Sequence, residues 1–345
     1  MEQCYPTLIR IYTIGIISTL FISGVSFFLL LKKSFSGNWP KYIFVFSVIF
    51  YLTYILVFQF LKLYTFKYYA DFTVWLELFS NLIHGRGIIT TLQQTSLGSG
   101  NTSNYFALHF VPLIYILALP LYIIKSYPAY LIVLQTLILT SSVIPAYLFA
   151  RNIFNDKKIG YLFAASLLFF PTLQYINLYD FEFLRISIPL LLFSFYFLHK
   201  KKYFTYYIFL ILSILVREEV ALTTFLLGFF ILFFRKERKI GAITSGISIL
   251  YFLVVIKIVM PYFAGSISGI HHHVAFENIS YLGSSPSQIL IYIVSHPFTI
   301  ISNLLDKIKI ANFLMYVLPF FFVSFFSPSI FSISMANLLL NFLST

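Results

Sequence analysis

The sequence predicts an all-α protein, a polytopic transmembrane helical bundle of about ten spans with a long outer loop that carries interfacial helices. Three observations lead to this prediction. The 345 residues are 60% hydrophobic and 21% aromatic, which excludes an ordinary soluble domain. Apolar runs of roughly 20 residues, the length that crosses a bilayer as a helix, recur along the chain. Only 10% of the residues are charged, and most of these lie in short turns between the runs.

The positive charge of the chain indicates membrane orientation rather than nucleic-acid binding. The net charge is +12, but Lys and Arg lie in short clusters at the ends of the apolar runs. Basic clusters of this kind mark the inner side of a membrane protein. We therefore expect membrane lipid as a partner and no nucleic acid. Cys4 is the single cysteine, so the chain cannot form an intrachain disulfide.

The predicted spans follow from the apolar runs and their basic flanks. In chain order they cover residues 9–31, 42–63, 128–150, 159–178, 183–198, 203–216, 220–234, 240–262, 310–326 and 328–343. The positive-inside rule places the amino terminus and every alternate turn outside, and it predicts a multi-pass protein of the cell membrane. We expect three parts: residues 1–40 with an extra amino-terminal helix, a membrane core over 41–262, and residues 263–345 with an outer loop and the last two spans.

The outer loop of the core, residues 64–127, contains the longest polar stretch of the chain. After Asp71, residues 72–84 predict an amphipathic helix whose apolar face is rich in aromatic residues, which is typical of helices in the membrane interface. Residues 108–124 are apolar, but as a span they would invert every later basic cluster. We therefore interpret them as a second interfacial or re-entrant helix.

Acidic residues are sorted to the outer side of this topology. Of the eleven acids, only Asp156 and Glu237 fall in inner turns, which leaves nine outside. Topology explains the inner bases, but it does not explain the outer acids. Three outer turns carry the parts of a candidate site, which are Asp71, the pair Asp180 and Glu182, and the run Arg217-Glu218-Glu219.

The hairpin 203–234 draws charge below the outer surface of the membrane. Its apolar arms have about 14 and 15 residues, roughly 21–23 Å of helix, whereas a hydrocarbon core is roughly 30 Å thick. Ionisable residues at that depth are costly unless they pair or line a water-filled cavity. Arg217 therefore either forms a structural ion pair with Glu218 or Glu219, or lines a cavity together with them.

Two further cations lie near the outer ends of predicted spans. Lys257 and Arg185 either snorkel to the interface or hold a lipid phosphate through charge-assisted hydrogen bonds. In the outer loop, candidate contacts for a phosphate or a sugar are Arg86, His84 and His109.

Asp71 has two interpretations, which are compatible. It suits the N-cap position of the helix that follows, because an Asp side chain accepts hydrogen bonds from free backbone N–H groups. It is also a candidate general base, since a carboxylate held at the membrane surface can take a proton from an acceptor hydroxyl.

A lone acid after an early outward span, followed by a long outer loop with two surface helices, resembles the GT-C superfamily of membrane glycosyltransferases. More closely, the chain resembles a prokaryotic family of multi-pass membrane proteins of unknown function that is thought to share that fold. The resemblance runs from about residue 65 to the end. The matching stretches are Asp71-Phe72-Thr73-Val74-Trp75, His84-Gly85-Arg86-Gly87, His109-Phe110-Val111-Pro112, Tyr179-Asp180-Phe181-Glu182, Val216-Arg217-Glu218-Glu219-Val220-Ala221-Leu222 and Tyr281-Leu282-Gly283-Ser284-Ser285-Pro286.

The resemblance implies an inverting GT-C-like enzyme that takes a sugar from a polyprenyl-phosphate lipid at the outer face. Asp71 would be its catalytic base. The side chains of Asp180, Glu182, Glu218 and Glu219 would hold the acceptor or, as a cofactor, a divalent cation. The leaving lipid phosphate would be stabilised by Arg217, Lys257 and Arg86. Further outer-loop candidates are Glu77, His84 and His109.

The chain departs from the family pattern at three places. Glu182 stands where the family usually has His, Arg217-Glu218-Glu219 replaces a Lys-Glu-Asp run, and Leu76-Glu77 replaces an acid-amide pair. Relatives also tend to continue beyond Thr345, so one alternative is a shortened, non-catalytic membrane protein. Another alternative is a transporter or flippase for lipid-linked sugars, although the sequence shows no internal repeat.

Overall fold

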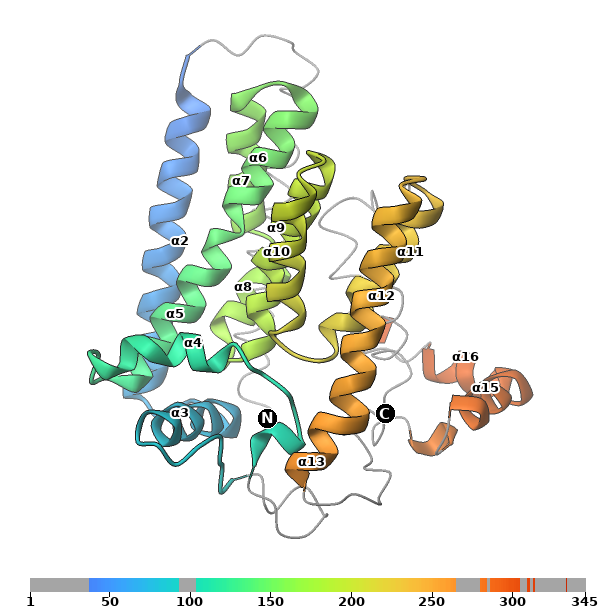
Figure 1. Cartoon of the computed structure of the whole chain (residues 1–345). Coiled ribbons are helices and arrows are strands. Elements are labelled where there is room, and N and C mark those ends of the chain that lie inside the picture. The colour runs from blue at the N-terminus through green and yellow to red at the C-terminus, as the bar shows by residue number, and fades with distance from the viewer. Residues whose placement is uncertain are drawn as a thin grey trace. The chain divides into compact units, whose positions relative to one another are not determined.

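The computed structural model describes residues 37–92, 104–264, 280–283, 286–304, 309–310, 313 and 333 of the chain. All regular elements among these residues are helices, which confirms the all-α prediction (Figure 1). They fall into two compact units, the first from residues 1–103 and 111–217 and the second from residues 104–110 and 218–345. Isolated positions apart, the described residues do not include the predicted spans 9–31, 310–326 and 328–343.

Three helical stretches among the described residues are long and apolar enough to cross a membrane. In the first unit these are α2 (Trp39–Tyr64) and the continuous pair α5 (Tyr127–Ser141) and α6 (Val143–Phe154). In the second unit the stretch consists of α12 (Arg238–Val254), the π-helical turn η4 (Val255–Val259) and α13 (Met260–Ala264). A fourth candidate is the bent pair α7 (Lys157–Leu168) and α8 (Pro171–Leu178).

The fourth candidate span, which covers the predicted span 159–178, is broken. Its two helices meet at 48°. Pro171 opens α8, and a proline disfavours helical backbone at the residue before it. Phe170 accordingly adopts ψ 121°, in the extended region. The bend therefore follows from a local signal in the sequence.

Three apolar helices are shorter than a bilayer is thick. They are α9 (Ser187–His199), which follows the 3-10 turn η3 (Phe183–Ile186), α10 (Tyr203–Ile214) and α11 (Val220–Phe233). With 12 and 14 residues, α10 and α11 measure about 18 and 21 Å, as short as the hairpin arms were predicted to be. By length and composition, the described residues carry three candidate spans, or four with the bent pair. The count of about ten stays a prediction.

Buried amides join the long helices of the first unit. Gln59 of α2 donates through Nε2 to the backbone oxygens of Asn177 and Tyr179, the latter at 3.1 Å. Gln135 of α5 donates to the Asn177 oxygen at 3.3 Å, and Asn177 Nδ2 donates to Tyr51 Oη at 3.0 Å. Polar side chains hold helices together in this way where no water competes. They fix the end of α8 and the turn that follows it.

Helix α3 (Ala70–Ile83) lies crosswise at the end of α2 (Figure 1). The predicted amphipathic helix over 72–84 is therefore confirmed, with a start two residues earlier. Its buried face consists of Phe72, Val74, Trp75, Leu78 and Phe79. Residues 111–124 form only the short elements α4 (Ile114–Ala118) and η2 (Leu119–Tyr122), and neither is long enough to span, as expected.

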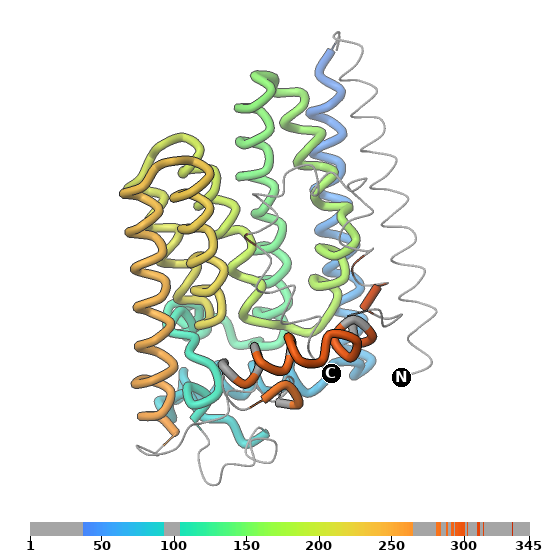
Figure 2. Tube along the Cα trace, turned by 90° about the vertical axis from the view of Figure 1, so that its right-hand side faces the viewer, coloured from blue at the N-terminus to red at the C-terminus, as the bar shows by residue number. Residues whose placement is uncertain are grey.

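In the second unit, α11 and α12 pack as an antiparallel pair (Figure 2). Two glycines permit the close approach. A Cβ atom at Gly228 would lie 2.6 Å from the backbone nitrogen of Ser245, and one at Gly241 would lie 2.6 Å from that of Leu232. Small residues at helix contacts are typical of membrane bundles. The remaining elements are η1 (Tyr105–Ala107), η5 (Ser280–Leu282), α15 (Pro286–Ser295) and α16 (Pro297–Leu304).

Candidate functional site

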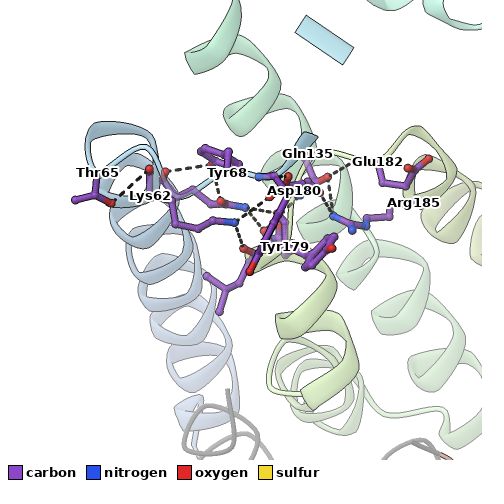
Figure 3. Close-up of polar contacts among 12 residues, drawn as sticks. Lys62, Thr65, Tyr68, Gln135, Tyr179, Asp180, Glu182 and Arg185 are labelled. Atoms are coloured by element: carbon purple, nitrogen blue, oxygen red, sulfur yellow. Dashed lines mark hydrogen bonds and ion pairs between the residues drawn. The ribbon is translucent and has the colours of Figure 1, made fainter. Parts of the chain in front are cut away.

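Asp180 fastens three segments of the first unit together (Figure 3). It lies in the turn between α8 and η3, and its side chain is only 1% exposed. Its Oδ1 accepts a hydrogen bond from Lys62 Nζ at 3.2 Å, and its Oδ2 accepts one from the backbone N–H of Tyr69 at 2.7 Å. Lys62 lies in the last turn of α2 and Tyr69 precedes α3, so one buried carboxylate holds the end of one helix and the start of the next.

Asp71 lies in the first turn of α3, two residues after Tyr69. The N-cap residue of α3 is Tyr69, so the interpretation of Asp71 as the N-cap is wrong. A distant carboxylate overrides the local signal, because Asp180 receives the N–H group of Tyr69 and thereby sets where the helix begins. The Asp71 side chain is exposed and accepts no hydrogen bond from any residue that the structure describes.

The pKa of the Asp71 carboxyl is raised above its ordinary value. Partial burial is the largest cause, since loss of water disfavours the charged form. The negative charges of Glu182 and Asp180 raise the pKa further, whereas Arg185 and Arg217 lower it. The net direction is upward, which makes the Asp71 carboxylate a stronger base than an isolated aspartate. These five charged residues are called the Asp71 cluster below.

The remaining members of the cluster are tied to one another. Arg217 Nη1 donates to Glu182 Oε1 at 3.1 Å, and both side chains are partly exposed. Arg185 donates to the backbone oxygen of Asp180 and, at 3.1 Å, to Gln135 Oε1 (Figure 3). The same amide oxygen accepts the backbone N–H of Glu182 at 3.1 Å. The cluster therefore presents one unbonded carboxylate beside two guanidinium groups whose positions are fixed.

Glu77 occupies the second half of α3 and has a structural role. Its carboxylate accepts hydrogen bonds from Thr90 Oγ1 at 2.8 Å and from Thr91 N–H and Oγ1 at 2.9 and 2.8 Å. Burial raises the pKa of Glu77, but these hydrogen bonds outweigh it and lower the pKa overall. Glu77 thus binds residues 90–91 to helix α3 through hydrogen bonds.

His84 and Arg86 lie at the opposite end of α3 from Asp71. His84 is the C-cap residue, and its Nδ1 contacts Ser80 O at 2.7 Å. Arg86 donates through Nε to Asn81 Oδ1 at 2.8 Å. Twelve residues of helix lie between Asp71 and His84, and the thirteen steps from one to the other rise by about 20 Å. The structure therefore does not bring these two outer-loop candidates to the Asp71 cluster.

The second unit holds its own carboxylate pair, His109 and Glu218. Glu218 is fully buried, with Oε1 2.8 Å from His109 Nδ1 and Oε2 accepting the backbone N–H of Phe110 at 2.9 Å. The pair fastens residues 109–110 to the start of α11. Glu219 is the half-buried N-cap residue of the same helix. Arg217 forms an ion pair with Glu182, whereas its predicted pairing with Glu218 or Glu219 stays a prediction.

Lys257 lies in the π-helical turn η4 of the second unit, and its side chain is exposed. Both interpretations of Lys257, snorkelling and lipid-phosphate binding, need an exposed ammonium group, so both stay open. Among the described residues, no group of three or more His, Cys, Asp or Glu side chains lies close enough to hold a metal ion.

Two residues that position the cluster were missed in the sequence. Lys62 carries a charge in the last turn of an apolar helix, and Gln135 is an amide in the middle of one. Polar groups in such runs are costly unless they are paired, and this cost was the available signal. A local pattern cannot reveal that Lys62 binds Asp180, because the two residues are 118 positions apart in the sequence.

Comparisons with known proteins identify a family. Among curated proteins and solved structures, nothing matches the chain. The family profile described as "Predicted membrane protein (DUF2079)" matches residues 59–345. The match covers far more than half of the chain and includes both units. The apolar helices and this match together show that the chain belongs to the DUF2079 family of predicted membrane proteins.

Proposed function

We propose that the chain is an integral membrane glycosyltransferase-like protein with a GT-C-like arrangement of spans. It would transfer a sugar from a polyprenyl-phosphate donor to an acceptor hydroxyl at the outer face of the cell membrane. One observation carries the proposal. Asp71 is an exposed carboxylate that accepts no hydrogen bond from the described residues, and its pKa is raised by partial burial and by two neighbouring acids.

In the proposed reaction, Asp71 takes the proton of the acceptor hydroxyl as that oxygen attacks the anomeric carbon of the sugar. The bond from this carbon to the phosphate oxygen breaks, and the polyprenyl phosphate leaves with the bonding electrons. Configuration at the anomeric carbon inverts, because attack and departure occur on opposite faces. Arg185 and Arg217 would stabilise the negative charge that develops on the phosphate.

The rigidity of the cluster supports this assignment. General-base catalysis requires a carboxylate at hydrogen-bond distance from its substrate in a fixed geometry. Asp180 anchors the start of α3, and Gln135 and Asp180 O anchor Arg185. The long apolar helices of the first unit, α2 and the pair α5 and α6, would give a polyprenyl tail an apolar environment.

The test is sugar transfer in membranes supplied with labelled polyprenyl-phosphate sugars. Asp71→Asn should lower the rate by about 10² to 10⁴, the usual contribution of a general base. Asp156→Asn is the matched control. Asp156 caps α7 through its side chain, and Asn is an equally good cap, so the rate should not change. Equal transfer by wild type and Asp71→Asn would remove Asp71 as the base.

A flippase for lipid-linked sugars is the second candidate, and the break between α7 and α8 favours it. Discontinuous helices are typical of transporters, where they line the substrate site. In this case, wild-type protein in vesicles would move a labelled sugar lipid between leaflets without transferring the sugar. Asp71→Asn would then leave that movement unchanged.

A further inference from the structure

Two tyrosines accompany Asp71 in the first unit. Tyr69 precedes Asp71 by two residues, and Tyr179 precedes Asp180 by one. Their rings stack at 5.8 Å between centroids with an interplanar angle of 18°. Burial, followed by the charges of Asp180 and Asp71, raises the pKa of the Tyr179 hydroxyl, so this ring lies within the field of the Asp71 carboxylate. The stacked pair therefore belongs to the surroundings of the cluster.

The tyrosine pair is held in place from several sides. The backbone N–H of Tyr69 donates to Asp180 Oδ2, and the backbone oxygen of Tyr179 accepts from Gln59 Nε2. The Arg185 guanidinium lies 5.6 Å from the centroid of the Tyr179 ring (Figure 3). A binding surface must be locked by its supporting contacts if it is to orient a ligand. These contacts fix the backbone at both tyrosines and support the Tyr179 ring, on which the Tyr69 ring stacks.

Tyr69 nevertheless remains accessible. It is 53% exposed, although a residue that only packs a core would be covered. An exposed aromatic ring supported from below, with carboxylate and guanidinium groups beside it, fits one ligand shape. Such a ligand has an apolar face of C–H groups and a rim of hydroxyls, which is the shape of a pyranose ring.

We infer that Tyr69, stacked on Tyr179, is the platform that binds the sugar ring of the substrate. The inference rests on the proposed function and deepens it, because it assigns the part of the chain that recognises the sugar. The C–H face of the pyranose lies on Tyr69, and its hydroxyls reach the carboxylates of Asp71 and Glu182. The surface of Tyr69 then selects a sugar, while the phosphate and the lipid tail are bound elsewhere.

Tyrosines are also enriched at membrane interfaces, where they anchor a protein whatever its ligand. Tyr64 at the end of α2 separates the two roles. It is 76% exposed, more than Tyr69, and the structure shows no ring stacking for it among the described residues. An anchoring role predicts similar effects of substitution at both positions, whereas a sugar platform predicts an effect at Tyr69 alone.

The experiment is saturation-transfer NMR on the purified full-length protein in nanodiscs. The probes are the methyl glycosides of glucose, galactose, mannose and N-acetylglucosamine. In wild type, irradiation of aromatic protons should label the C–H protons on one face of the pyranose ring. Tyr69→Leu should weaken glycoside binding by about threefold to tenfold, the range expected for a lost aromatic contact. Tyr69→Phe, which keeps the ring, and Tyr64→Leu should both bind as wild type does.

The inference is overturned if no glycoside is labelled by wild type, or if Tyr64→Leu weakens binding as much as Tyr69→Leu does. The absence of labelling in wild type overturns the inference even if Tyr69→Leu does not fold. Failure of the proposed function has a different result. If Tyr69→Leu loses glycoside binding but wild type transfers no sugar from any lipid donor, the platform stands and the transferase does not.

Discussion

The two carboxylates of helix α3 have opposite surroundings. Glu77 receives hydrogen bonds from Thr90 and Thr91, and its pKa is lowered overall. Asp71, less than two turns away, receives none from the described residues, and its pKa is raised. Buried Glu218 in the second unit resembles Glu77, since it accepts from His109 and Phe110.

The difference separates carboxylates that stabilise the fold from one that does not. A carboxylate with several donors contributes to stability, because its hydrogen bonds offset the loss of water. A raised pKa means that the ionised form of a carboxylate is less stable in the folded chain than in water. At neutral pH such a residue therefore lowers the stability of the fold. Such residues cluster at functional sites. On this ground Asp71, and not Glu77 or Glu218, is the residue available for chemistry.

The largest effect on stability is expected in the second unit. His109→Ala removes a donor to the buried Glu218 carboxylate and should lower the free energy of unfolding by about 3 kcal/mol. His84→Ala is the control, because His84 is exposed and its loss should change stability by less than about 1 kcal/mol. Thermal unfolding in detergent measures both. Equal midpoints would show that Glu218 does not depend on His109.

A smaller effect is expected at Glu77. Glu77→Gln keeps the shape but weakens the acceptor, which should cost about 1–2 kcal/mol at neutral pH. The Glu77 pKa is lowered in the folded chain, so its contribution is complete above the ordinary pKa and is lost as pH falls through the lowered value. The stability of wild type and variant should therefore converge in acid. Asp71→Asn should not destabilise the protein at neutral pH, and a clear loss there would break the contrast with Glu77.

The smallest effect is a displacement of the acid limb of the pH–rate profile for sugar transfer. The base acts when ionised, so transfer falls as pH drops through the Asp71 pKa. Beyond burial, Glu182 raises this pKa and Arg217 lowers it. Glu182→Gln should therefore move the limb to lower pH, and Arg217→Gln should move it to higher pH. Shifts of both variants in the same direction would show that Asp71 is not the titrating group.

The helices that carry the site were predictable where their signals are local. An apolar run of sufficient length predicts α2, and alternation of apolar and polar residues at helical spacing predicts α3. The start of α3 was misplaced, because Asp71 is a suitable N-cap residue in isolation. The actual cap donor, Tyr69 N–H, binds a carboxylate 111 residues away. No pattern within a window of the sequence contains that contact.

The partners within the candidate sites were less predictable than their members. Outward sorting of acids selected Asp71, Asp180, Glu182 and Glu218. It did not predict the ion pair of Arg217 with Glu182, which lies 35 residues earlier. It also left out Gln135, because an uncharged amide does not enter a count of charges.

The π-helical turn η4 has a consequence for the orientation of α13. A π turn holds one residue more than an α-helical turn, so the chain beyond it is rotated by about 100° relative to an unbroken helix. Phe263 of α13 contacts Phe106 of η1, with ring centroids 5.3 Å apart. Without the inserted residue, the Phe263 ring would face another direction. The inserted residue therefore sets the rotation of α13 about its own axis. Through the contact with Phe106, it also influences the segment that presents His109 to Glu218.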